Sequence, residues 1–206
     1  MDRRSTCQWG CRATKVGEMP PKERADAARN RRAILDATRA MLIEHGAEAV
    51  TMDRVAAAAG VGKGTIFHRF GSRAGLLHEL IGEPAVELMA AVRSGPPPLG
   101  PGAAAGDRLV AFFDAFTRLV IANVELVVAY NAIPPHPRRD EFHAFWADHI
   151  AELLREARPD LDADTVGQLL LSILGGEMVP AMARAGKTEP LLHAVREIVE
   201  SVLRAP

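Results

Sequence analysis

The side chains best suited to chemistry lie in residues 63–70, a short segment of mixed polar and apolar residues. Ile66 and Phe70 are four apart, which places them on one side of a helix. The other side carries Lys63, Gly64, Thr65, Phe67 and His68. An ammonium group neutralises phosphate, and hydroxyl and imidazole groups hydrogen-bond the edges of bases. The pattern therefore predicts contact with a nucleic acid.

Two short helices joined by a tight turn are expected to position these groups. Thr51 is a candidate N-cap for a helix over 52–59, and Gly60-Val61-Gly62 connects this helix to a second one over 63–70. A two-turn helix is about 12 Å long, and the major groove of B-DNA is about 12 Å wide. The second helix therefore fits the groove.

The first turn of the second helix is expected to lie closest to DNA. Its free backbone amides, the Lys63 ammonium and the Thr51 hydroxyl can meet phosphate oxygens. Gly64 has no side chain, which lets the backbone approach closely. Thr65 and His68 carry groups that can hydrogen-bond base edges.

The rest of the chain is also patterned for helices. Apolar residues recur at three- and four-residue spacing over about 25–45, and a further helix is capped by Ser72 and runs to about residue 93. More helices are expected over about 107–131, 139–157, 163–185 and 189–203. Aromatic residues make up only 5% of the chain, which argues against a β-sandwich or barrel. The expected fold class is all-α, with a three-helix helix-turn-helix domain followed by a larger helical domain.

Residues 29–77 resemble the DNA-binding domain of the tetracycline-repressor (TetR) family. The shared features are His45-Gly46 at a helix end, Thr51 before the second helix, the Gly60-Val61 turn, Lys63-Gly64-Thr65, an aromatic residue after Ile66, and Leu76-Leu77. The resemblance implies that the phosphate contacts are Thr51, Lys63, Gly64, Phe67, Arg69 and Arg73. It further implies that Thr65 and His68 reach the bases.

Three positions depart from the family pattern. Gly62 stands where a Ser-like N-cap is usual, Phe67 where Tyr is usual, and Arg69 where His is common. Phe67 has no hydroxyl to donate to a phosphate, so one hydrogen bond of about 0.5–1.5 kcal/mol net is missing. The permanent charge of Arg69 can offset that loss. The DNA sequence that this protein recognises cannot therefore be inferred from the sequences that its relatives recognise.

Charge divides the chain unevenly. Residues 1–73 carry a net charge of +6 and residues 74–206 a net charge of −7. This asymmetry favours an N-terminal part that faces nucleic acid, although a charged tail on an ordinary helical protein would give similar totals. The expected parts are a disordered tail over 1–24, a DNA-binding domain over 25–72, and an effector-binding and dimerisation domain over 73–206.

The predicted tail contains two cysteines and a second possible start. Cys7 and Cys11 could form a disulfide or contribute to a metal site, but they have no cluster of partner residues. We therefore expect no metal and no cofactor. Met19 is an alternative first residue.

The aromatic residues of the second half allow two interpretations. Phe112 and Phe116 are four apart on one helix, as in an ordinary core. The family resemblance favours the alternative, a cavity that holds an unidentified small-molecule effector. The candidate pocket residues are Phe112, Phe116, Asn123, Tyr130, Phe142, His143, Trp146 and Met178. His143 and His149 are six apart and lie on different faces of a helix, which argues against a metal site.

The last two predicted helices have wide apolar faces. Two copies related by a two-fold axis would form a four-helix interface, while the alternative is that these faces pack only within one chain. The candidate interface residues are Leu169, Leu170, Ile173, Leu174, Val195, Ile198, Val199 and Val202. A dimer would place two reading helices on two half-sites of an inverted repeat.

These features predict a homodimeric, ligand-responsive transcriptional regulator, a repressor that a small molecule releases from double-stranded DNA. Activation is equally compatible with the residues. We expect no enzymatic activity, no membrane association and a cytoplasmic location, because the sequence contains neither 20 uninterrupted apolar residues nor a secretory signal. Two alternatives are a small helical enzyme or ligand carrier that uses the aromatic-rich region, and a protein that coats DNA without sequence preference.

Overall fold

The computed structural model describes residues 21–134 and 137–204, and all regular structure in these ranges is helical. The first elements are α1 (Pro21–His45), the 3₁₀ turn η1 (Ala47–Ala49), α2 (Met52–Ala59), α3 (Lys63–Phe70) and α4 (Arg73–Ser94). The others are α5 (Ala105–Ala122), α6 (Val124–Asn131), α7 (Pro137–Ala157), α8 (Ala163–Gly175), α9 (Met178–Arg184) and α10 (Thr188–Leu203). The expected all-α fold is confirmed.

Most of the predicted N-terminal tail lies outside the described residues, including Cys7, Cys11 and Met19. Residues 21–24, which we expected in the tail, instead form the first turn of α1. The first helix is therefore longer than its apolar pattern predicts.

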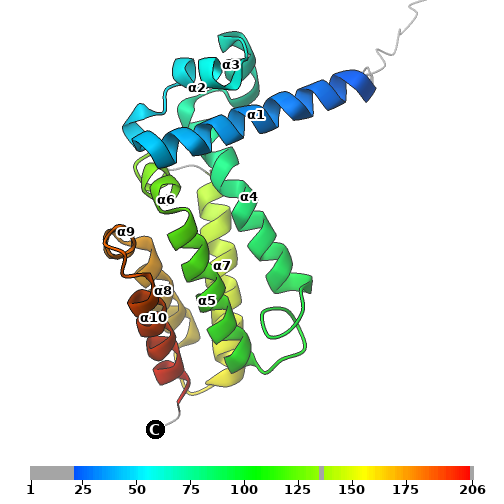
Figure 1. The fold of residues 1–206 in the computed structure, drawn as a ribbon. Coiled ribbons are helices and arrows are strands. Elements are labelled where there is room, and N and C mark those ends of the chain that lie inside the picture. The colour runs from blue at the N-terminus through cyan, green and yellow to red at the C-terminus, as the bar shows by residue number, and fades with distance from the viewer. Residues whose placement is uncertain (1–20, 135–136, 205–206) are drawn as a thin grey trace, which may run out of the picture.

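Two hydrophobic cores follow one another along the molecule, a head and a body (Figure 1). The head core is built by α1, α2, α3, the first half of α4 and α6. The body core is built by the second half of α4 with α5, α7, α8, α9 and α10. Leu76 and Leu80 of α4 belong to the head core, whereas Leu88 and Val92 belong to the body core. A single helix thus joins the two cores.

Two predicted helices are each broken into two. The helix expected over 107–131 ends at Ala122 and restarts at Val124, because Asn123 leaves the helical region with φ −122° and ψ 30°. The side-chain amide nitrogen of Asn123 (Nδ2) donates to the Leu119 carbonyl at 2.9 Å and caps the end of α5. The predictions of one uninterrupted helix here and over 163–185 were wrong.

The second break falls at the glycine pair after α8. Gly176 is extended, with φ −88° and ψ 176°, and the chain restarts as α9 at Met178. By length and composition alone, the span Ala163–Arg184 could cross a membrane, and 33% of its most apolar window is buried in the protein. Because the chain breaks at Gly176, however, the 13 residues of α8 are too short to span about 30 Å of hydrocarbon.

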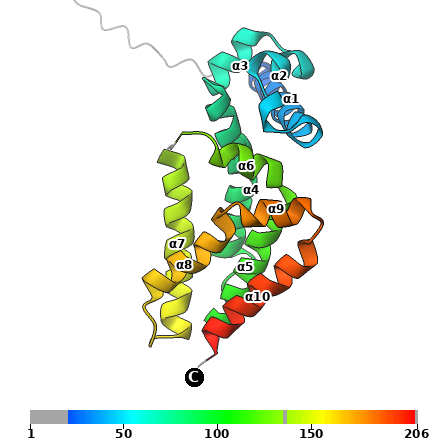
Figure 2. The same cartoon turned by 90° about the vertical axis from the view of Figure 1, so that its left-hand side faces the viewer.

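The helices α8, α9 and α10 lie on one side of the body (Figure 2). α8 packs on α7 and α10 packs on α5. Each of these two helices therefore turns one face to the rest of the chain and another to its surroundings.

Candidate nucleic-acid interface and cavity

The α2–turn–α3 unit is fixed by local hydrogen bonds. The Thr51 hydroxyl oxygen accepts from the Arg54 backbone N–H at 3.3 Å and caps α2. Gly60 ends α2 in the left-handed region at φ 65°, a conformation that favours glycine. The Val61 N–H donates to the Ala56 carbonyl at 3.0 Å and holds the turn against α2. The predicted helix, short turn and helix are confirmed.

One flank of α3 is buried and the other is exposed. Ile66 and Phe70 are 0% and 8% exposed and anchor α3 in the head core. The exposed flank consists of Lys63, Gly64, Thr65, Phe67, His68 and Arg69. A side chain added at Gly64 would meet nothing within 4 Å. In Figure 1, α2 and α3 stand at the far end of the head, away from the body. The flank is therefore free to enter a groove.

Lys63 lies at the junction of the two helices. Its Nζ is 2.7 Å from a carboxylate oxygen of Asp53 in α2 and 5.9 Å from the ring centroid of Phe67. Both partners of the ion pair are more than half exposed, and such pairs contribute little, typically about 0–1 kcal/mol. A phosphate can therefore compete with Asp53 for the ammonium group.

Arg73 is placed differently from its expected role. Its Nε donates to the Val50 carbonyl at 2.9 Å and its Nη2 to the Ala47 carbonyl at 2.8 Å. The half-buried side chain thus satisfies backbone oxygens of η1 and of the residue before Thr51. This geometry gives Arg73 a positioning role in the head, and its phosphate contact stays a prediction.

A cavity of about 230 Å³ lies inside the body, between α4, α5, α6, α7 and α8. Five of the eight expected pocket residues line it: Phe116, Tyr130, Phe142, His143 and Trp146. The Phe116 and Trp146 ring centroids are 5.4 Å apart and form an aromatic wall. Most other lining residues are aliphatic. The cavity can therefore hold a small apolar molecule or group.

The other three expected pocket residues lie elsewhere. Phe112 is fully buried behind the wall, with its ring 5.6 Å from that of Trp146. Asn123 closes α5, as described above. Met178 is exposed at the start of α9, because the chain breaks before it. The helix breaks beside Asn123 and Met178, which sequence spacing does not reveal, separate these two residues from the cavity, and any role of the three in effector binding stays a prediction.

Several lining residues were not predicted from the sequence. Ile81 and Ala85 of α4 line the cavity, as do Asn131 at the end of α6 and Arg139 of α7. Arg139 stands one helical turn before His143, so their i, i+4 spacing could have indicated a shared face. Ile81 and Ala85 carry no such signal, because they read as ordinary core residues.

The same α4 that lines the cavity is held to α1 by ion pairs. Arg31 donates to Glu83 at 3.0 Å and to Glu79 at 2.9 Å, and Arg39 lies 3.5 Å from Glu83. The hydrogen bond to Glu79 is the main cause that raises the pKa of the Arg31 guanidinium above its ordinary value. These ion pairs therefore connect the helix that lines the cavity to the first helix of the head.

The expected interface residues divide into two groups. Leu169 and Ile198 are 63% and 42% exposed, and Ile173 and Val202 are half-buried. The four buried members are Leu170, Leu174, Val195 and Val199. These four side chains fill the core of their own chain, so the exposed and half-buried members are the ones available to a second copy, and the interface stays a prediction.

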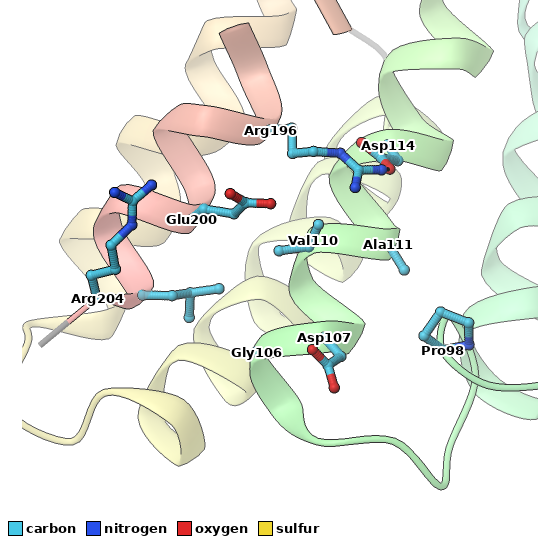
Figure 3. A pocket seen from close by; sticks show the side chains of 10 residues that line it. Pro98, Gly106, Asp107, Val110, Ala111, Asp114, Arg196, Glu200 and Arg204 are labelled. Atoms are coloured by element: carbon cyan, nitrogen blue, oxygen red, sulfur yellow. Dashed lines mark hydrogen bonds and ion pairs between the residues drawn. The ribbon is translucent and has the colours of Figure 1, made fainter. Parts of the chain in front are cut away.

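A wider groove of about 680 Å³ runs between α5 and α10 (Figure 3). Asp114 is paired with Arg196 across it, and Asp107 and Glu200 also border it. Among the described residues, no group of three or more His, Cys, Asp or Glu side chains could hold a metal ion. The groove therefore presents a mixed-charge surface and not a metal site.

His149 is a buried imidazole beside the body core. It is 7% exposed, and its ring lies 5.3 Å from that of Phe112. Burial, the main cause, and the Arg108 charge together lower its pKa to about 4, against the opposing effect of Glu152. His149 is therefore neutral at pH 7 and serves as a packing group.

Known proteins share both the sequence and the architecture. Residues 34–80 match the family described as "Bacterial regulatory proteins, tetR family". The chain is 30% identical over 203 residues to the HTH-type transcriptional repressor Rv1474c of Mycobacterium tuberculosis, covering 90% of this chain and 99% of that protein. Its fold is similar to that of the TetR family regulator PfmR from Thermus thermophilus, with TM-score 0.62, 22% identity, and coverage of 85% and 95%.

It is also similar to the transcriptional regulator FadR from Bacillus subtilis, whose structure was determined in complex with stearoyl-CoA. That comparison has TM-score 0.63 and 17% identity, and covers 84% of this chain and 97% of FadR. The family match includes α2, α3 and the exposed flank described above. The chain belongs to the tetR family of bacterial regulatory proteins and is a DNA-binding transcriptional regulator.

Proposed function

We propose that the protein is a homodimeric repressor that binds an inverted-repeat operator through α3 and leaves it when a small effector occupies the body cavity. The observation that carries this proposal is the exposed polar flank of α3, anchored from behind by Ile66 and Phe70. Residues 25–72 would act as the reading domain and the remainder as the sensing and dimerisation domain. A location in the cytoplasm and the absence of catalysis follow from this role.

Each residue of the flank has a proposed part. Lys63 and Arg69 neutralise phosphates, and Thr65 and His68 reach base edges. The Thr51 hydroxyl oxygen caps α2, and its hydrogen is left to donate to a phosphate. Phe67 packs against sugar, since its ring is 42% exposed and has no polar group.

Dimerisation follows from the limited reach of one α3. Eight residues offer few base contacts, whereas two copies read two half-sites about 34–36 Å apart or further. Leu169 of α8 and Ile198 of α10 are exposed apolar residues on the helices that lie on one side of the body (Figure 2). A second copy would cover them.

The release of DNA by an effector depends on two helices, α4 and α6, that line the cavity and also contribute to the head core. Ile81 of α4 and Tyr130 of α6 line the cavity and also belong to the head core. An occupant that favours a different arrangement of α4 and α6 therefore changes the spacing of the two heads. A differential affinity of about 1–3 kcal/mol reduces DNA binding about 5- to 150-fold.

A gel shift with DNA from upstream of the protein's own gene tests the proposal. The double variant Lys63→Ala, Thr65→Ala should lose more than tenfold in affinity, because it removes a phosphate contact and a base contact per subunit. Lys187→Ala removes an exposed charge between α9 and α10, outside the helix-turn-helix, and is the control. Unchanged affinity of the double variant would contradict the proposal.

A further inference from the structure

We propose that the body cavity takes a small organic anion, a carboxylate joined to an apolar chain or ring of about eight carbon atoms. This inference rests on the proposed function, in which that cavity holds the effector. It adds the chemical class of the ligand, which follows from the distribution of charge and size around the cavity.

The size of the cavity limits the ligand. A volume of about 230 Å³ equals that of about eight water molecules at roughly 30 Å³ each, and a methylene group is of similar size. Phe116 and Trp146 form one wall, and Leu119, Leu171 and Leu174 complete an apolar interior. The interior therefore suits about eight carbon atoms without polar substituents.

Arg139 gives the cavity a positive side. Its guanidinium donates to the Asn131 side-chain oxygen at 2.7 Å and lies 5.1 Å from the Tyr130 ring centroid. All three residues line the cavity, and His143 does so one turn further along α7. The bond to Asn131 orients the guanidinium and uses only one of its five N–H donors. The remaining donors suit a carboxylate, which accepts two parallel hydrogen bonds from an arginine.

The charge of Arg139 is not neutralised by the described part of the chain. Arg31, Arg184 and Arg196 each form an ion pair with a carboxylate, whereas the contacts of Arg139 are an amide and an aromatic ring. Among the described residues that line the cavity, none is Asp or Glu. An anionic head would therefore gain a partner there, while a cationic head would meet an unopposed positive charge.

Tryptophan fluorescence can test this inference, because Trp146 lies in the cavity wall. The chain has two tryptophans, so Trp9→Phe leaves Trp146 as the only one. The probes are octanoate, 1-octanol and octylamine, which share a chain and differ in the head. We expect octanoate to bind about tenfold more tightly than octanol, with octylamine the weakest of the three.

Two variants in the Trp9→Phe background separate the charge from the cavity. Arg139→Gln should weaken octanoate binding about tenfold and leave octanol binding unchanged. Arg118→Gln, which removes an exposed arginine of α5, should change neither. Equal affinities for octanoate and octanol, no effect of Arg139→Gln, or no binding of any probe would each overturn the anionic class.

The role of the cavity as an effector site is tested separately by a gel shift with and without octanoate. If octanoate binds with the expected preferences but leaves DNA affinity unchanged, the anionic class stands and the release mechanism fails. If octanoate also weakens DNA binding, and Arg139→Gln removes that effect, the anionic ligand class and the release mechanism are both supported.

Discussion

A nitrogen of the Arg31 guanidinium lies 3.0 Å from a carboxylate oxygen of Glu83, across the gap between the first helix of the head and the helix that enters the body. Glu83 is two residues from Ile81 and two from Ala85, both of which line the cavity. One segment of α4 therefore lines the cavity on one side and holds α1 on the other. In the proposed mechanism, a ligand that contacts α4 and α6 but none of α1, α2 and α3 acts on the reading helix through this connection.

Glu83→Gln should loosen this connection. Glu83 receives hydrogen bonds from both Arg31 and Arg39, and all three side chains are about one-quarter to one-third exposed. We expect a loss of about 1 kcal/mol in the free energy of unfolding, measured by urea denaturation. Glu87→Gln, at an exposed position one turn along α4, is the matched control and should be neutral. The difference between the two variants should shrink in 1 M salt because of screening; a difference independent of salt would argue against an electrostatic connection.

Gly64→Ala should separate stability from function. The new methyl group meets nothing within 4 Å, and alanine favours a helix over glycine by about 0.5–1 kcal/mol, so the melting temperature should rise slightly. The same methyl group would stand between α3 and the DNA backbone, so DNA affinity should fall. Thermal unfolding and a gel shift measure the two effects. Unchanged DNA affinity would show that Gly64 does not approach DNA.

Leu169→Glu combined with Ile198→Glu should convert a dimer into a monomer. Charges at these exposed positions would be buried without partners in a two-fold interface. Ile43→Glu is the matched control, because Ile43 is also a large exposed apolar residue, at 71%, but lies in α1 of the head. Sedimentation velocity distinguishes the two species. A dimer that survives the double substitution would place the interface elsewhere.

His149 should make the protein less stable as the pH falls. Its pKa is about 4 in the folded state against an ordinary value of 6.5, so between these values the unfolded chain binds a proton that the folded chain does not. Stability from this source is complete above pH 6.5 and decreases toward pH 4, by about 2 kcal/mol at pH 5 and about 3 kcal/mol in all.

His149→Phe keeps an aromatic ring beside Phe112 and removes the titrating group. Urea unfolding at pH 7 and pH 5 should therefore show a smaller loss in this variant than in the wild type. His193→Phe, at an exposed position of α10, is the control. Equal losses in the wild type and in His149→Phe would mean that His149 does not govern this dependence.

The helix-turn-helix could be predicted from sequence because local residues mark its boundaries. Thr51 supplies a cap and Gly60 a left-handed residue, and both effects act over a few residues. The breaks at Asn123 and Gly176 were missed because apolar periodicity continues on both sides of them. Local groups at the breaks, the Asn123 side chain and the Gly175-Gly176 pair, end these helices although the apolar spacing runs on.

The interface and the cavity show a second limit of prediction from the sequence. Periodicity identified the apolar faces of α8 and α10, but it could not tell that Leu170 and Val199 would be covered by their own chain. Periodicity likewise predicted both Phe112 and Phe116 as pocket residues, although only Phe116 lines the cavity. Which neighbour a side chain meets depends on contacts distant in sequence.

Hydroxyl-radical footprinting on the DNA upstream of the gene tests the central claim most directly. Two heads held by one dimer should protect two half-sites of an inverted repeat on the same face of the duplex, one helical turn of about 34–36 Å or a multiple apart. Lys63→Ala combined with Thr65→Ala should abolish both footprints together. A single protected segment, or uniform protection without sequence preference, would contradict the account.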